Sequence, residues 1–161
     1  MPSLDDSTSL GVSLAAAGVG WAEPFRLVDP TPGVVTVSRQ VGGDFWERVL
    51  CGHVTFTADA TAGTRNPRFQ ILDGQARVLY EANLSTGVVA STAVIASIGT
   101  NGNPSLAASG FTQASIPDLI LPSGYTMQFT ANVVGPADAW TGAIFLLGRY
   151  PTSAVRTGTA G

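Results

Sequence analysis

The sequence predicts an all-β protein, an antiparallel two-sheet β-sandwich of the jelly-roll kind with an extended N-terminal arm. Hydrophobic and polar side chains alternate along residues 46–80, with Val54 and Phe56 on one face and Thr55 and Thr57 on the other. This period of two is that of a β-strand. About eight extended runs follow one another between regularly spaced turns, without intervening helical periods. Such runs pair antiparallel and most economically form two packed sheets.

The first two strands are predicted on either side of a glycine turn. Residues 34–41, VVTVSRQV, are rich in β-branched residues, which favour strands. Gly42-Gly43-Asp44 is typical of a turn. Residues 46–58 then form a long strand, in which Gly52 marks a bulge or a bend.

The next two strands are predicted to form a hairpin. Residues 68–72, RFQIL, are extended, and Asp73-Gly74-Gln75 turns the chain tightly into a strand at residues 76–81. Residues 86–98 are small and β-branched, so their pattern favours a further extended run, although their alanines also permit a helix.

The C-terminal half of the sandwich contains one ambiguous run and two clear strands. Residues 106–116 are ambiguous, and Pro117 confines them to a sheet edge if they form a strand. Pro122-Ser123-Gly124 turns the chain into a strand at residues 125–134. Residues 140–150 supply the last strand.

We expect the chain to divide into three parts. Residues 1–33 form an arm and a Pro-rich connector, residues 34–150 the sandwich, and residues 151–161 a polar tail. The prolines of the connector forbid a helix and favour an extended backbone. An immunoglobulin-like sandwich is the competing topology, and the absence of a Cys pair around a buried Trp weighs against it.

The arm is too apolar for a segment free in solvent. Residues 5–9 are suited to cap a short helix, but Gly11, Gly18 and Gly20 make an isolated helix marginal. We therefore expect the arm to become ordered only against another surface, either the rest of its own domain or another subunit. The predicted partner-binding residues are Leu10, Leu14, Trp21 and Phe25.

Composition excludes several classes of function. Hydrophobic residues make up 45% of the chain and charged residues only 12%, a low charge density for a solvated monomer, so we expect neighbouring polypeptides to cover much of the surface. A net charge of −3 without a basic cluster argues against nucleic-acid binding. No apolar run reaches the length of about 18 residues that a membrane span needs. The N-terminus lacks the positive charge of a secretory signal, so we expect synthesis in the cytoplasm.

No constellation of residues predicts catalysis, a cofactor or a metal site. Cys51 and His53 share one strand face, but a nucleophile needs a base within about 3 Å and a group that orients the base. We expect Cys51 to pack as a small hydrophobe and His53 to be a polar strand residue, since two positions do not make a structural zinc site. The carboxylates Asp59, Asp73, Asp118 and Asp138 lie at predicted turns, where Asp binds its own backbone.

The aromatic residues admit two interpretations. Trp46 and Trp140 each start a long strand, where large rings cap a sandwich core, and we expect them to pack there rather than to form a sugar-stacking platform with Trp21. For Trp21 we expect docking on a partner or on the flank of the sandwich. Arg65 is expected to pair with Asp59 across a loop rather than to contact a partner.

A set of short motifs resembles small β-sandwich virion proteins of tailed bacteriophages, particularly those of actinobacterial hosts. The resemblance covers roughly residues 34–150. Its motifs are Trp46 with Val49-Leu50, Val54-Thr55-Phe56-Thr57 with Asp59, Arg65, Asp73-Gly74, Leu121-Pro122-Ser123-Gly124, and Asp138-Ala139-Trp140.

The resemblance implies a non-enzymatic structural protein of the virion, assembled in the host cytoplasm. It implies a capsid decoration or minor capsid protein, or else a component of the neck or tail tip. We expect a homo-oligomer, a trimer or a ring, whose arm lies on an adjacent subunit or on the major capsid protein. Two alternatives stay open: a glycan-binding or receptor-binding module, and a hydrolase built on the same scaffold.

Overall fold

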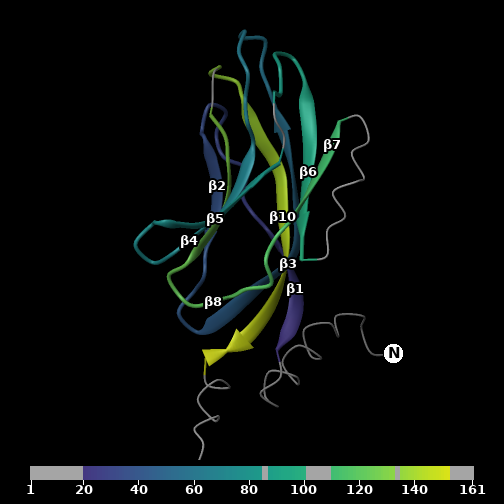
Figure 1. Ribbon diagram of the computed structural model, residues 1–161. Coiled ribbons are helices and arrows are strands. Elements are labelled where there is room, and N and C mark those ends of the chain that lie inside the picture. Colours follow the sequence, from purple (N-terminus) through teal and green to yellow (C-terminus); the bar gives the residue numbers. More distant parts are fainter. Residues whose placement is uncertain (1–19, 85–86, 101–109, 133–134, 153–161) are drawn as a thin grey trace, which may run out of the picture.

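The computed structural model describes residues 20–84, 87–100, 110–132 and 135–152, and within them it forms two β-sheets that face one another (Figure 1). The ten elements named in these residues are all strands. No helix in the described ranges has the length and apolar character that crossing a membrane requires.

The larger sheet, sheet A, has six strands in the order β1-β10-β3-β6-β7, with the short β8 paired to β3. Its strands are β1 (Trp21–Arg26), β3 (Phe45–Thr57), β6 (Ala93–Gly99), β7 (Phe111–Ser115), β8 (Ile120–Leu121) and β10 (Ala139–Pro151). The two long strands, β3 and β10, lie side by side at its centre and carry most of the core side chains of this sheet.

The smaller sheet, sheet B, has four strands in the order β2-β9-β4-β5. Its strands are β2 (Thr36–Gln40), β4 (Arg68–Leu72), β5 (Val78–Asn83) and β9 (Thr126–Thr130). All three pairs within it are antiparallel.

The strand pairing is nested, which identifies the topology. When β7 and β8 are set aside, the first of the remaining eight strands pairs with the last, β1 with β10, and the pairs β2 with β9, β3 with β6 and β4 with β5 follow inward along the chain. A long hairpin rolled into two sheets has this order, and it is the order of a jelly roll. The predicted fold class is therefore confirmed.

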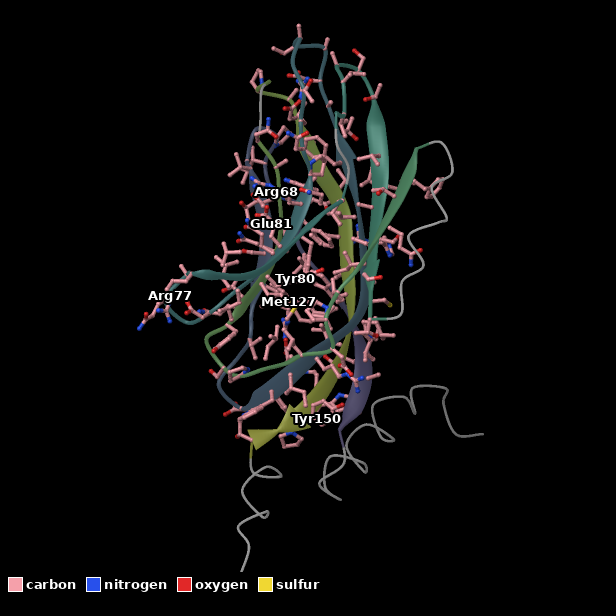
Figure 2. The ribbon with its side chains drawn as sticks, viewed as in Figure 1. Arg68, Arg77, Tyr80, Glu81, Met127 and Tyr150 are labelled. Atoms are coloured by element: carbon pink, nitrogen blue, oxygen red, sulfur yellow. The ribbon has the colours of Figure 1, made fainter. Side chains whose placement is uncertain are left out.

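The core lies between the two sheets and is built on aromatic rings. Phe129 of sheet B stacks on Phe145 of sheet A with ring centroids 5.2 Å apart, and Phe69 packs against both rings. Met127, which is fully buried, also lies between the sheets (Figure 2). Trp140 is 1% exposed and packs on Phe56, so its predicted place in the core is correct.

A β-bulge in β3 changes which side chains face the core. Val49 pairs with Leu147 and Cys51 pairs with Leu146, so Leu50 is an extra residue without a partner on β10. Because side chains alternate along a strand, one extra residue moves the preceding side chains to the opposite face. Glu47 is buried as a result, and Trp46 is only half-buried and lies outside the core cluster. The prediction that Trp46 packs in the core is wrong for this reason.

Three predicted segments differ from the structure. Residues 21–26 of the predicted arm and connector form β1, a strand of sheet A that pairs along its whole length with β10, although the sequence pattern places them outside the sandwich. The predicted run at 86–98 is a strand only from Ala93, because Val88 bridges to Arg65 and Ser91 adopts a left-handed backbone with φ of 57°. The ambiguous run at 106–116 contains the strand β7, which lies at a sheet edge as Pro117 indicated. It is parallel to β6 and not antiparallel.

Candidate interaction surface

The outer face of sheet A carries few charged side chains. We define it by the strand residues that alternate with the buried ones. They are Ala22, Pro24, Arg26, Trp46, Arg48, Cys51, His53, Thr55, Thr57, Ala93, Ile95, Ser97, Phe111, Gln113, Ser115, Thr141, Ile144, Leu146 and Tyr150. Phe111 is 51% exposed and lies beside Ile95 of the neighbouring strand.

Formal charge on the outer face of sheet A comes from Arg26 and Arg48, and no carboxylate is among its residues. Arg48 is neutralised by Asp118, which follows β7 and accepts hydrogen bonds of 2.5 and 2.6 Å from the guanidinium. The bond to Asp118, and after it a bond to Tyr150, raises the pKa of Arg48 above its ordinary value. Arg26 at the β1 edge thus supplies most of the net positive charge of this face.

A groove of about 200 Å³ lies across β1, β10 and β3 on this face. Pro24, Leu146 and Cys51 are cross-strand neighbours on β1, β10 and β3. The groove is lined by these three residues together with Gly52, His53, Ile144 and Phe145. Cys51 is exposed here, so the prediction that it packs as a small hydrophobe is wrong, whereas Cys51 and His53 do share one face as expected.

The outer face of sheet B has a contrasting, polar character. Its side chains form a hydrogen-bonded ladder across the strands. Gln128 donates to Gln70 at 2.7 Å, and Gln70 donates to Glu81 at 2.5 Å. Beside this ladder lies an open hollow of about 420 Å³, with Arg68 and Glu81 among its lining residues (Figure 2). The other lining residues are Asn66, Asn83 and Asn132.

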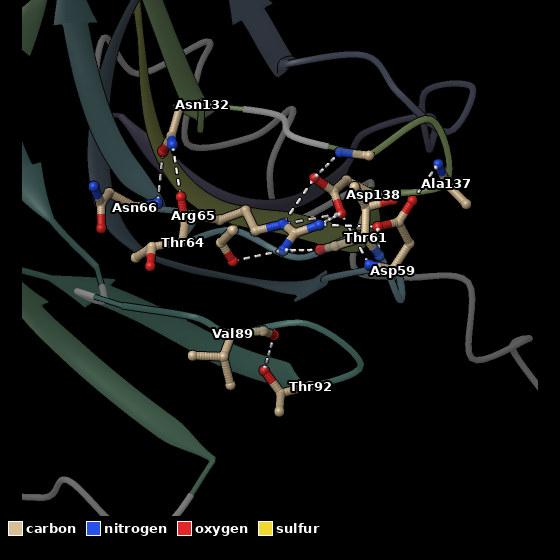
Figure 3. Close-up of polar contacts among 12 residues, drawn as sticks. Asp59, Thr61, Thr64, Arg65, Asn66, Val89, Thr92, Asn132, Ala137 and Asp138 are labelled. Atoms are coloured by element: carbon tan, nitrogen blue, oxygen red, sulfur yellow. Dashed lines mark hydrogen bonds and ion pairs between the residues drawn. The ribbon is translucent and has the colours of Figure 1, made fainter.

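Arg65 fixes the loops at one end of the sandwich (Figure 3). Its fully buried guanidinium donates to Asp59 at 2.9 Å and to Asp138 at 3.0 Å, and also to the carbonyl oxygens of Thr61 and Gly63. The predicted pairing with Asp59 is confirmed. The pairing of Arg65 with Asp138, 73 residues away along the chain, was not predicted.

Asp59 also caps the loops through the backbone. Burial acts to raise the pKa of its carboxyl, but hydrogen bonds from the backbone N–H groups of Thr61 and Ala137 outweigh burial, so the pKa lies below its ordinary value. Asp73 has a similar role in the β4–β5 hairpin. The backbone N–H of Arg77 lowers the pKa of Asp73, burial opposes this, and the Arg77 side chain and the Gln75 N–H lower it further. The expectation that acids bind the backbone of their own turns is confirmed for Asp59 and Asp73, whereas Asp118 pairs with the Arg48 side chain.

The predicted partner-binding residues divide into two groups. Leu10 and Leu14 lie outside the described residues. Trp21 and Phe25 lie on β1 and contact the sandwich itself. The Trp21 ring meets Phe45 edge to face at 5.4 Å, and the guanidinium of Arg39 lies 3.6 Å from the centre of the Phe25 ring. Trp21 therefore docks on the sandwich flank, one of the two places expected for it, and a partner-binding role for all four residues stays a prediction.

A buried charge network lies at the end of the sandwich where β1 begins. Glu47 is fully buried and accepts hydrogen bonds from Arg39, and Arg149 lies between Glu47 and Glu23. Arg149 also lies 4.1 Å from the centre of the Phe45 ring, a cation–π contact. These contacts tie β1, β2, β3 and β10 together, and the sequence pattern did not predict them.

Within the described part of the chain, no three His, Cys, Asp or Glu side chains come close enough to hold a metal ion. Cys51 and His53 are separated by one residue on an open sheet face. A catalytic thiol needs a base in hydrogen-bond contact and a third group to orient that base.

No protein-family model matches the chain, and no curated protein matches it. Among solved structures, that of the infectious bursal disease virus Gx strain aligns with 82% of this chain at 8% identity and a TM-score of 0.37. The T13 particle of infectious bursal disease virus aligns with 83% at 9% identity and a TM-score of 0.34, and the VP2 subviral particle of the same virus aligns with 82% at 8% identity and a TM-score of 0.32. The alignment covers 32% of each of these longer chains. These structures come from infectious bursal disease virus and not from a tailed bacteriophage.

Proposed function

We propose that this chain is a non-enzymatic structural protein of a virus particle, which acts by binding other polypeptides through the outer face of sheet A. The carrying observation is the contrast between the two outer faces. The face of sheet A combines the exposed side chains of Phe111 and Leu146 with two arginines and no carboxylate, whereas the face of sheet B carries a polar, hydrogen-bonded ladder. A sheet face that stays in water normally carries polar and charged side chains, and depletion of charge marks the core of an interface.

Composition supports the same proposal. Charged residues make up 12% of the chain, about half the share of about 25% that is typical of a soluble globular domain. The jelly roll is used by viral capsid domains, but also by lectins and cupins, so the fold alone does not decide the function. The motifs that resemble virion proteins of tailed bacteriophages favour the capsid alternative.

The finer proposal is a capsid decoration or minor capsid protein of a bacteriophage, with a neck or tail-tip component as its variant. In this proposal the chain forms a trimer or a ring in the virion, and its N-terminal arm attaches it to an adjacent subunit or to the major capsid protein. Attachment at several points raises the avidity of a symmetric oligomer steeply.

Particle reconstitution tests the proposal. Particles assembled without this protein are mixed with the purified chain, sedimented and assayed for occupancy. We expect the full chain to bind, and a chain lacking residues 1–19 to fold but not to bind. The deletion stops at residue 19 because β1, which begins at Trp21, belongs to sheet A. Full occupancy by the shortened chain would refute attachment by the arm, and failure of the full chain to bind would refute the virion role.

A glycan-binding module is the second candidate, and the polar hollow on sheet B favours it. Amide, guanidinium and carboxylate groups line the hollow and are suited to hydrogen-bond sugar hydroxyls. The burial of Trp140 removes one ring of the stacking platform that such a module would use. A specific hit on a glycan array that is lost in Glu81→Gln and Asn83→Ala would favour this candidate over the first.

A further inference from the structure

We infer that the groove on the outer face of sheet A is the receptor for the N-terminal arm, residues 1–19, of a neighbouring copy of this chain. The inference rests on the proposed function and specifies which surface of the assembly receives the arm. It rests on four properties of the groove and the arm: charge, apolar pattern, the exit direction of the chain and reach.

Charge on the two surfaces is complementary. The arm segment contains Asp5 and Asp6 and no Arg or Lys. The outer face of sheet A contains no carboxylate. Its exposed Arg26 lies on β1, the edge strand, two residues after the groove-lining Pro24 and on the same face. Opposite charges at the rim of an apolar contact fix orientation and suppress wrong partners.

The apolar pattern of the arm suits an extended segment lying on a sheet face. Leu10, Val12 and Leu14 are separated by Gly11 and Ser13, so in an extended backbone the three large side chains point the same way. The groove offers Leu146, Ile144 and Pro24 as apolar walls. Its volume of about 200 Å³ accommodates one or two aliphatic side chains, as expected for an anchor that fills a pocket.

The exit direction of the chain favours a neighbour over the same subunit. Gly20 packs closely against the ring of Tyr150, which lies at the end of the sandwich where β10 finishes (Figure 2). β1 therefore begins at this end of sheet A, with Trp21 opposite Arg149. Pro24, the groove residue on β1, lies four residues after Gly20, which is about 13 Å at the usual rise per residue of a strand. To reach its own groove the arm would have to reverse at Gly20.

The length of the arm is sufficient for an exchange between copies. A segment of 19 residues spans up to about 60 Å when extended. Sheet A has five strands across its main path, a width of about 20 Å at the usual strand spacing. An arm can therefore leave one sandwich and cross the face of the next.

The single native cysteine provides the test. One chain carries Leu14→Cys with Cys51→Ser, and its partner chain is wild type, with Cys51 in the groove. The two full-length chains are mixed and oxidised mildly, and the products are separated without reducing agent. We expect a disulfide-linked heterodimer, because docking places residue 14 of one chain beside Cys51 of the other.

The matched control moves the receptor thiol to the other sheet. Its partner chain carries Cys51→Ser with Leu79→Cys, a position on β5 that is 54% exposed. We expect roughly tenfold less heterodimer with this control, because only the groove is held near the arm at high effective concentration. Equal yields at the two positions would overturn the inference. A disulfide formed within one chain by Leu14→Cys alone would also overturn it, since that outcome places the arm on its own groove.

A second variant separates this inference from the proposed function. Leu146→Asp puts a charge into the groove at an outward position that is 36% exposed. We expect it to abolish self-association in light-scattering measurements while circular dichroism stays that of the folded chain. If self-association persists, the groove is not the receptor. If Leu146→Asp dissociates the oligomer and yet the wild-type chain fails to bind particles, the arm exchange stands and the virion role fails.

Discussion

Gly52 of β3 lies directly opposite Phe145 of β10, and the Phe145 ring occupies the space that a side chain on residue 52 would need. A Cβ atom on residue 52 would stand 2.6 Å from Cδ1 of that ring. Phe145 is fully buried and stacks on Phe129 of the opposite sheet. The glycine therefore sets the distance at which the central strand of sheet A meets the aromatic core.

Gly52→Ala is expected to destabilise the fold. The added methyl group forces the Phe145 ring to move within a closely packed core, which costs about 1–3 kcal/mol. The free energy of unfolding in urea measures the loss. Gly42→Ala is the control, since a Cβ atom there meets nothing within 4 Å, and it should leave stability almost unchanged. A loss at residue 52 no larger than at residue 42 would contradict the packing argument.

Arg65→Met is expected to be one of the most destabilising substitutions in the loops. It leaves the carboxylates of Asp59 and Asp138 without their cation, and breaking such a buried arrangement costs about 3–5 kcal/mol. The measurement is the denaturant midpoint. Arg77→Ala serves as the comparison, because the Arg77 side chain is 72% exposed and a surface pair contributes at most about 1 kcal/mol. Similar losses for the two variants would show that Arg65 does not organise the loops.

Ala76→Gly is expected to stabilise the protein. Ala76 closes the β4–β5 hairpin with φ of 60°, a left-handed conformation that costs a residue with a Cβ atom about 1–2 kcal/mol. Glycine removes that strain but loses more entropy on folding, so the net gain is about 0.5–1 kcal/mol. Thermal unfolding measures it. Ala93→Gly in β6, where the backbone is extended, should instead lower stability.

Stability is expected to fall in acid because two carboxylates have lowered pKa values in the folded chain. For Asp59 and Asp73 the folded-state pKa lies below the unfolded value, so their contribution is fully present above about pH 4. It is lost as the pH falls through the lower folded-state values, where the folded carboxylates also become protonated. Denaturant midpoints measured between neutral pH and pH 3 test this.

Asp73→Asn isolates one of these groups. The amide cannot titrate, so the variant should be less stable than wild type at neutral pH and should show a flatter decline in acid. A variant whose midpoint follows the wild-type curve at every pH would show that Asp73 does not contribute to the acid response.

Alternation along strands predicted most of the fold and failed at one residue. The pattern around Val54 and Phe56 placed one face of β3 in the core correctly. The extra residue Leu50 then reverses the alternation, so Trp46 turns outward and Glu47 inward. A bulge depends on the partner strand, and no local pattern in β3 marks its position. Gly52 was the expected site and proved to serve the Phe145 ring instead.

The features that the sequence pattern did not predict are contacts between residues far apart in the chain. The pairing of Arg65 with Asp59 was predictable because six residues separate them. Asp138 lies between β9 and β10, 73 residues from Arg65, and only the fold brings it close. Residues 24–26 of the connector are extended as expected, but their pairing with β10 is a property of the topology. The outer face of sheet A, which lacks carboxylates, likewise emerges only when its strands are placed in order.

The nested pairing puts Trp21 opposite Arg149, so the start of β1 and the finish of β10 lie side by side at the same end of sheet A. A pull applied between these ends loads the rungs joining β1 to β10 one after another and never all together. The molecule is therefore mechanically weakest along this seam, and force transmitted through its two tails would peel off β1 long before it disturbed the aromatic centre.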